Sequence, residues 1–375
     1  MIYKNANIIF ENEIKKADLI TEDGIIKEIT QNAVGNGAEV YNCEGLYLSA
    51  GLIDLHVHGG GGYSFMGNES DILHAAEAHR KNGVTSILPT ALADGLDVLG
   101  CVCENVKRAK RKNKNILGVH LEGPFLSKEM CGAQNSDKML ISSRTDYMPL
   151  LEKYGDIIKM TGAAPELDGG FELGKTLADF GIVASVAHSS GDYDTAVKAL
   201  SYGYSDITHI YNACTSYRKD SAYRKAGTAE AGLSEDGYTV QVIADLIHLP
   251  AGLIRLIHKA KGADRMYLIS DGLEFSASEF VDGARVIQKN GVEALIKDGA
   301  AFTSDGKRLA GSIASGITLV KNVYNTGISL TDSVKMMTLT PAKVVGADRK
   351  GRIRTGCDAD IIVFDKEFNL KHISA

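Results

Sequence analysis

The segment from Gly51 to His58 reads Gly-Leu-Ile-Asp-Leu-His-Val-His and is followed by four glycines, Gly59 to Gly62. An apolar run that ends in a glycine cluster predicts a buried β-strand. Residues two apart on a strand face the same side, so His56 and His58 project together, about 6 to 7 Å apart. Two such imidazoles can bind one metal ion or a pair of ions, so the fold must bring further ligands to the end of this strand.

A strand-then-helix rhythm repeats through the middle of the chain. Apolar segments predict eight strands, at 52–57, 84–89, 116–121, 157–161, 182–187, 206–210, 240–244 and 266–269. Amphipathic stretches predict helices after most of them, at 70–81, 97–112, 192–201, 250–261 and 315–326. Eight such units in about 290 residues favour a closed (β/α)8 TIM-like barrel over an open doubly wound sheet.

The two ends of the chain differ from the middle, because both carry short strand-like runs separated by turns. These runs lie at 2–9, 17–21, 25–29 and 46–48, and a turn followed by a strand lies within 351–365. We therefore expect an α/β protein in which residues 1–50 plus 345–375 form a small β-sandwich domain. The catalytic barrel, residues 51–344, would be inserted between these two segments.

The composition is typical of a globular enzyme, with 44% hydrophobic and 23% charged residues and a net charge of -6. The densest basic run, 107–114, has no interleaved aromatic residues and predicts a solvated helix face rather than a nucleic-acid patch. We find neither a signal peptide nor about 20 consecutive apolar residues, so we expect a cytoplasmic protein without a membrane partner. The six cysteines lack C-x-x-C spacing, which favours reduced thiols.

Imidazoles and carboxylates follow most of the predicted strands. Barrel active sites lie at this end of the strands, and these groups are ligands for Zn²⁺ and Fe²⁺. One histidine at a strand end is more often a core residue, but six in register favour a metal site. The residues are His56 and His58, His120 and Glu122, His188, His209, Asp245 with His248, and Asp271.

Each polar residue near these strands can be a metal ligand or can have a purely structural role. Glu122 follows apolar residues, where an unpaired carboxylate is costly to bury, so we interpret it as a ligand rather than a loop cap. We expect His120 to hydrogen-bond a ligand or loop, and Asp54 to make a structural hydrogen bond. The other histidines, which we expect to be solvated, are His74, His79, His258 and His372.

The order of these motifs resembles the amidohydrolase superfamily and, within it, the N-acetylglucosamine-6-phosphate deacetylases. The motifs run from residue 46 almost to the C-terminus. They are Asp54-Leu-His56-Val-His58, His120-Leu-Glu122-Gly-Pro124, Val-Ala-His188-Ser, Thr-His209-Ile-Tyr-Asn212-Ala213, Ala-Asp245-Leu-Ile-His248 and Ile-Ser-Asp271-Gly. The resemblance implies a barrel that binds one or two divalent ions per chain, Zn²⁺ or Fe²⁺.

The resemblance also implies a role for each matching residue. Glu122, His188 and His209 match the ligands of the ion that the family keeps. His56 and His58 match the ligands of a second ion found in some members. Asp271 matches the catalytic acid and base and is a candidate ligand of the second ion. The implied substrate-binding positions are Asn212, Ala213, Arg224, His248 and Ala133.

Arg224 matches the arginine that family homodimers lend to the phosphate in the neighbouring subunit, but its surroundings depart from the family pattern. The family usually has Arg-Glu-Pro-Gly, and this chain has Arg-Lys-Ala-Gly from Arg224 to Gly227. The departure leaves open whether Arg218, Lys219 or Lys225 shares or replaces the phosphate contact, or whether the preferred sugar differs.

The expected reaction is metal-dependent hydrolysis of N-acetylglucosamine 6-phosphate to glucosamine 6-phosphate and acetate, in amino sugar catabolism and recycling. One alternative is the galactosamine epimer or another N-acyl substrate on the same scaffold. A dihydroorotase-type cyclic amide hydrolase fits less well, because those enzymes usually have a lysine at the position of Glu122. A non-catalytic scaffold also fits less well, because all six candidate metal and catalytic positions are present.

Overall fold

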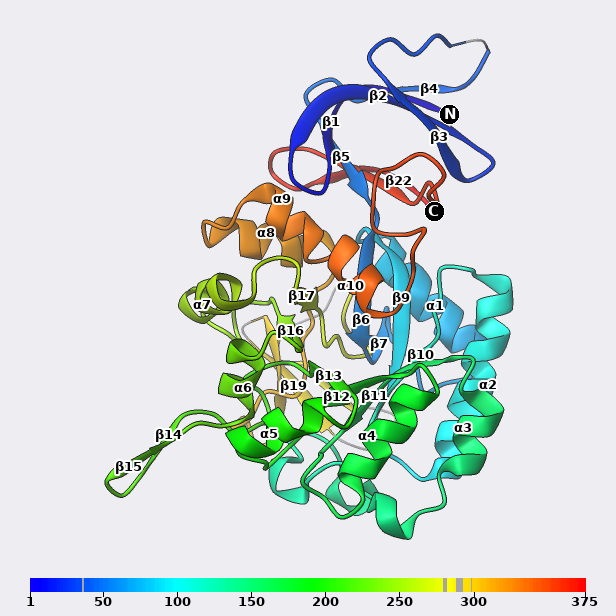
Figure 1. The fold of residues 1–375 in the computed structure, drawn as a ribbon. Coiled ribbons are helices and arrows are strands. Elements are labelled where there is room, and N and C mark those ends of the chain that lie inside the picture. The colour runs from blue at the N-terminus through cyan, green and yellow to red at the C-terminus, as the bar shows by residue number, and fades with distance from the viewer. Residues whose placement is uncertain (36, 279–281, 288–292, 298) are drawn as a thin grey trace.

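The structure, a computed structural model, describes residues 1–375 except 36, 279–281, 288–292 and 298. At its centre, eight parallel strands form a nearly closed barrel surrounded by helices, as predicted (Figure 1). The barrel strands are β6 (Leu52–Val57), β9 (Val84–Ala91), β10 (Val119–Glu122), β11 (Ile158–Ala163), β12 (Val183–Val186), β13 (Tyr204–Ile207), β16 (Thr239–Ile243) and β17 (Met266–Ile269). All eight predicted strands are present, with ends shifted by a few residues.

The barrel closes where the first strand meets the last. The backbone N–H of Asp271 donates to the carbonyl of His56 at 2.9 Å, and that of His58 donates to the carbonyl of Gly272 at 2.8 Å. These bonds lie just beyond the C-terminal ends of β6 and β17. The closure therefore places the His-x-His motif beside the aspartate that follows the eighth strand.

Helices cover the outside of the barrel, and all five predicted helices are among them. They are α1 (Glu69–Arg80), α2 (Leu96–Lys112), α3 (Met148–Tyr154), α4 (Gly170–Asp179), α5 (Tyr193–Leu200), α6 (Thr228–Ser234), α7 (Ala251–Lys261), α8 (Ile317–Asn325), α9 (Leu330–Lys335) and α10 (Leu339–Val344). In β17, Met266 and Leu268 join the core shared with the helices, whereas Tyr267 and Ile269 join a separate cluster with Ala342 of α10. Alternate strand residues thus fill the two sides of the barrel wall.

A second sheet joins both ends of the chain, as the sequence predicts. Its strands are β1 (Ile2–Ile9), β2 (Ile14–Glu22), β3 (Ile25–Thr30), β4 (Val40–Asn42), β5 (Tyr47–Ala50), β21 (Ile361–Phe364) and β22 (Leu370–Ser374). These strands pair in the order β22-β21-β5-β1-β2-β3, with β4 also paired to β1, so the small domain predicted from both termini is present. It has its own apolar core. The domain boundaries at residues 50 and 345 stay a prediction.

Three smaller β elements were not predicted. A short pair, β7 (Gly59–Gly60) and β8 (Tyr63–Ser64), follows the first barrel strand. A hairpin of β14 (Arg218–Asp220) and β15 (Tyr223–Lys225) projects away from the barrel (Figure 1). A three-stranded sheet is made of β18 (Arg285–Ile287), β19 (Glu293–Lys297) and β20 (Ala300–Thr303). Within the described residues, none of the helices has the length and apolar character needed to span a membrane.

Candidate active site and metal centre

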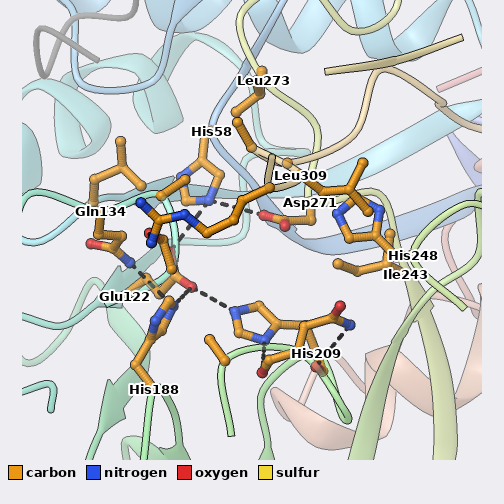
Figure 2. Close-up of a pocket in the computed structure, with 18 residues that line it drawn as sticks. His58, Glu122, Gln134, His188, His209, Ile243, His248, Asp271, Leu273 and Leu309 are labelled. Carbon is orange, nitrogen blue, oxygen red and sulfur yellow. Dashed lines mark hydrogen bonds and ion pairs between the residues drawn. The ribbon is translucent and has the colours of Figure 1, made fainter. Parts of the chain in front are cut away.

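Glu122, the last residue of β10, lies among four imidazoles, and Figure 2 shows three of them, those of His58, His188 and His209. Its Oε1 is 2.9 Å from Nε2 of His188 and 2.9 Å from Nε2 of His209. Nε2 of His56 is 3.5 Å from the same Oε1, and Nε2 of His58 is 3.4 Å from Oε2. All five side chains are buried. The ends of four strands, β6, β10, β12 and β13, thus bring these predicted ligands together.

Asp271 follows β17 and adds a second carboxylate beside this group. Its Oδ1 is 3.1 Å from Nε2 of His58 and 3.5 Å from Nε2 of His56. Burial opposes ionisation of Asp271, but the hydrogen bond from His58 and the nearby imidazole charges outweigh burial and lower its pKa to about 2. The buried site therefore holds two carboxylates, Glu122 and Asp271, that require a positive counter-charge.

Three of the imidazoles are oriented from behind by oxygen acceptors at Nδ1. The pairs are His56 with Oε1 of Gln241 at 2.9 Å, His188 with the carbonyl of Met130 at 2.7 Å, and His209 with the carbonyl of Asn212 at 3.1 Å. An acceptor at Nδ1 requires the proton there, so each neutral ring presents a bare lone pair at Nε2. These lone pairs point at carboxylate oxygens, which are also acceptors. A divalent cation between them satisfies both, so the residues present fit a metal ion.

The donor set falls into two overlapping groups that can each hold an ion. One group contains His56, His58 and Glu122, the other contains Glu122, His188 and His209, and within each group the donor atoms lie within 4.8 Å of one another. Nε2 of His56 is buried without a hydrogen-bond partner. In the absence of a cation, burial opposes charge on this ring, but the Glu122 and Asp271 carboxylates raise the pKa of His56 to about 9. The carboxylate shared by the two groups places Glu122 at the centre of a candidate metal centre.

Backbone strain is concentrated at the same strand ends. His188, His209, Ala213 and Asp271 have positive φ angles of 44°, 26°, 44° and 47°. Residues with a Cβ rarely adopt this left-handed region, and such conformations cluster at functional sites where surrounding structure enforces them. The chain therefore turns sharply after β12, β13 and β17, so that the side chains of the site face one another.

All the candidate ligands except His56 lie in the wall of a cavity of about 270 Å³. His58, Glu122, His188, His209 and Asp271 line it, whereas His56 does not. Four of the five predicted substrate-binding residues also line it, namely Ala133, Asn212, Ala213 and His248. Figure 2 shows Asp271 between His58 and His248 at one side of this cavity. The structure thus joins the metal donors to a space that can admit a small substrate.

His248 is held in place by an acidic neighbour. Its Nδ1 donates to Oδ2 of Asp245 at 2.7 Å, while Oδ1 of Asp245 accepts the backbone N–H groups of Ile247 and His248. Burial lowers the pKa of His248, but the hydrogen bond to Asp245 and its charge outweigh burial and raise it. The bond to Asp245 fixes the ring of His248, and Nε2 stays available to bind a substrate in the cavity.

Arg224 lies outside this cavity. It belongs to the exposed hairpin, where its backbone pairs with Lys219 in the ladder between β14 and β15. Its Nη1 donates to the carbonyl of Ala222 at 2.9 Å, within the same hairpin. Within one chain, therefore, the structure does not bring Arg224 to the other predicted site residues.

Two structural interpretations from the sequence are confirmed. Asp54 is fully buried, and its Oδ1 accepts the backbone N–H groups of His56 and Ser270 at 3.3 Å each. His120 donates from Nδ1 to the carbonyl of Leu55 at 3.2 Å and packs edge-on against the ring of His56. Both residues therefore support the ligands from behind.

The prediction for His79 is wrong, because this side chain is completely buried. Its Nε2 donates to the carbonyl of Gly59 at 2.8 Å, and its Nδ1 lies 2.8 Å from the hydroxyl of Ser315. Ser276 also donates to the carbonyl of Gly59. The periodicity of α1 does not reveal that loops following β6 and β17, and the one preceding α8, cover this face of the helix. Burial lowers the pKa of His79 to about 4.

Sequence reasoning missed a polar chain inside the barrel. The side-chain amide of Gln241 donates to Oδ2 of Asp206 at 2.7 Å, while its oxygen accepts from His56. The available signal was a glutamine and an aspartate inside predicted buried strands, where a polar group is costly unless it is hydrogen-bonded. Gln134 and Arg308 line the cavity and were also missed, because they lie on irregular segments with no strand-end signature.

A model of the Amidohydrolase family matches residues 47–375. The chain belongs to the amidohydrolase family. This family is metal-dependent, in agreement with the His and Glu donor groups of the structure. This amidohydrolase is therefore a hydrolytic enzyme, and the barrel bearing the donor groups falls within the matched residues.

Relatives of this amidohydrolase cover nearly its whole length. A Bacillus subtilis protein named N-acetylglucosamine-6-phosphate deacetylase is 30% identical over 379 residues, covering 98% of this chain and 93% of its own. A Bos taurus protein with the same name is 31% identical, covering 89% and 83%. The crystal structure of the N-acetylglucosamine-6-phosphate deacetylase from Pasteurella multocida is 28% identical with a TM-score of 0.92, covering 100% of this chain and 97% of its own.

Proposed function

We propose that this amidohydrolase hydrolyses the N-acetyl group of N-acetylglucosamine 6-phosphate to give glucosamine 6-phosphate and acetate. The observation that carries the proposal is that Glu122 lies among four imidazoles next to Asp271, and that both carboxylates line one cavity. The relatives named above support the choice of substrate and a place in amino sugar catabolism.

In this proposal Glu122, His188 and His209 hold one divalent ion, Zn²⁺ or Fe²⁺. His56 and His58, with Asp271 as a further donor, hold a second. A bound divalent ion supplies a water with its pKa lowered from about 16 to about 7, and it polarises the amide carbonyl. The contacts of His56, His188 and His209 at Nδ1 keep the rings turned so that Nε2 faces Glu122.

Asp271 is the proposed catalytic acid and base. Its carboxylate is ionised and lines the cavity, so it can accept a proton from the attacking water. It then returns the proton to the departing amine, because an amide nitrogen leaves poorly unless it is protonated. The hydrogen bond from His58 holds Oδ1 in position between these two transfers.

The substrate-binding residues are proposed from their place in the wall. Asn212, Ala213, Ala133 and His248 would hold the sugar, with His248 fixed by its bond to Asp245. Arg224 on the projecting hairpin would contact the phosphate in the neighbouring subunit of a homodimer. The homodimer and a cytoplasmic location stay predictions.

The second candidate is an amidohydrolase for the galactosamine epimer or for another N-acyl compound. The sequence next to Arg224 supports this second candidate, because Lys225 and Ala226 replace the Glu-Pro pair that is usual in the family. A non-catalytic scaffold is disfavoured, because the donors converge in a strained, buried arrangement that packing alone does not require.

The test is an assay of acetate release after the purified chain is reconstituted with one or two equivalents of Zn²⁺ or Fe²⁺. The substrates are N-acetylglucosamine 6-phosphate, N-acetylgalactosamine 6-phosphate and unphosphorylated N-acetylglucosamine. We expect the highest kcat/KM for the first. A higher value for the second would establish the epimer as substrate, and no acetate from any of them would reject the proposed function.

A further inference from the structure

A guanidinium group lies in the wall of the cavity. Among the described residues that line it, Arg308 is the one lysine or arginine. A sugar phosphate carries close to two negative charges at neutral pH, and such a dianion needs cationic or N–H donors when it enters a partly buried site. Among the described lysines and arginines, Arg308 is therefore the one placed to meet the charge.

The guanidinium of Arg308 lies next to the proposed sugar contacts. Its Nη1 donates to the carbonyl of Gly132 at 3.2 Å. A Cβ built on Gly132 would lie 3.7 Å from Cβ of Ala213 and 3.3 Å from Cε1 of His188. Arg308 thus occupies the side of the cavity that is shared by the metal ligand His188 and the substrate-binding position Ala213.

The guanidinium also keeps donors available for an anion. Arg308 forms no ion pair with a carboxylate of the described residues, and its contact with Gly132 uses one of its five N–H groups. Asp305, which lies in the same turn, accepts from the hydroxyl of Thr303 and the backbone N–H of Lys307. A carbonyl contact orients an arginine without neutralising it, which leaves the planar fork free for bidentate phosphate binding.

The backbone around Arg308 is fixed by the sheet that carries it. The N–H of Thr303 donates to the carbonyl of Arg308 at 2.8 Å, and the N–H of Ala310 donates to the carbonyl of Ala301 at 2.9 Å. Ala301 and Ala310 are buried in the small core of this sheet. The returning segment after β20 therefore presents Arg308 to the cavity from a defined position, which limits the entropy lost on binding.

We propose that Arg308 binds the substrate's phosphate from within the same chain, so that the three-stranded sheet β18 to β20 contributes the phosphate specificity. This inference rests on the proposed function. It differs from a contact made by Arg224, which lies on the exposed hairpin outside the cavity of its own chain.

The test compares Arg308→Gln and Arg308→Lys in the metal-loaded, full-length enzyme. For Arg308→Gln we expect KM for N-acetylglucosamine 6-phosphate to rise about 10- to 100-fold, with kcat within about twofold, because a charged hydrogen bond made to substrate and transition state alike is lost. We expect kcat/KM for unphosphorylated N-acetylglucosamine to stay unchanged. The inhibition constant of inorganic phosphate should rise together with KM. In Arg308→Lys, both constants should rise less than in Arg308→Gln.

Lys307→Gln is the matched control, since Lys307 is an exposed neighbour that does not line the cavity. It should leave KM unchanged. An unchanged KM in Arg308→Gln, or equal losses with the phosphorylated and unphosphorylated sugars, would overturn the inference and leave the proposed function intact. A wild-type enzyme that releases no acetate from either sugar phosphate would instead reject the proposed function, and the inference with it.

Discussion

The carboxylate of Asp271 lies 3.1 Å from Nε2 of His58, although 213 residues separate them in the chain. The contact exists because β17 closes the barrel against β6, with Asp271 and His58 both bonded through their backbones across the seam. A residue at the end of the eighth strand thereby reaches the donors at the end of the first. The proposed proton carrier and the proposed second metal position are built by the same closure.

Asp271→Asn should remove turnover while leaving the metal bound. Asparagine preserves the size and one oxygen of the side chain but cannot accept a proton, so we expect kcat to fall by about 10²- to 10⁴-fold. Elemental analysis should find that the ion held by Glu122, His188 and His209 is still bound. The matched control is Asp156→Asn, because Asp156 is an exposed partner of Lys107 and does not line the cavity. Near-normal kcat in Asp271→Asn would show that another group moves the proton.

Glu122→Gln should lose metal from both donor groups, because Glu122 belongs to each of them. We expect metal affinity and kcat to fall by at least about 100-fold, because mutating a residue that only hydrogen-bonds a metal ligand already lowers affinity or activity by up to about 100-fold. Metal content after dialysis and acetate release measure the two effects. Wild-type metal content in this variant would mean that the ion is held elsewhere.

The double variant His56→Ala with His58→Ala should separate one-metal from two-metal chemistry. It removes one donor group and leaves Glu122, His188 and His209 in place. We expect the metal bound per chain to fall from two equivalents to one, as counted by elemental analysis after saturation. If wild type and variant bind the same number of ions, no second ion is held by this pair.

His79 should make the stability depend on pH in acid. The folded protein keeps its imidazole neutral down to about pH 4, whereas the unfolded chain protonates near 6.5. The unfolded state therefore binds the extra proton, and the free energy of unfolding falls as the pH drops from 6.5 to 4. The free energy of unfolding falls by about 3 kcal/mol at most through His79. Above pH 6.5 this residue causes no further change in stability.

Denaturant unfolding at pH 4 and pH 7 measures this effect. We expect a smaller pH dependence in His79→Gln than in wild type. His74→Gln provides the control, because His74 is exposed on the same helix. Equal pH dependence in the wild type and His79→Gln would mean that other groups carry the acid sensitivity.

The strand pattern explains how much of the site was predictable. The barrel strands are mainly apolar runs that end at one edge of the sheet, so the sequence assigns Glu122, His188, His209 and Asp271 to that edge. Arg308 could not, because it follows a small sheet inserted after the eighth strand, where neither periodicity nor spacing indicates which way the segment returns. His79 failed for a related reason, since the loops that bury it come from distant parts of the chain.

By itself, the sequence determined the βα order, the pairing of the chain ends in one small domain, and the kinds of donor at each strand end. These are local properties, set by hydrophobic periodicity and by the chemistry of imidazole and carboxylate. Only the tertiary structure decided that Glu122 lies between two donor groups, that Gln241 and Asp206 support His56, and that Arg308 enters the cavity while Arg224 does not. Those relationships depend on barrel closure and on how loops fold over it, which are contacts between residues far apart in the chain.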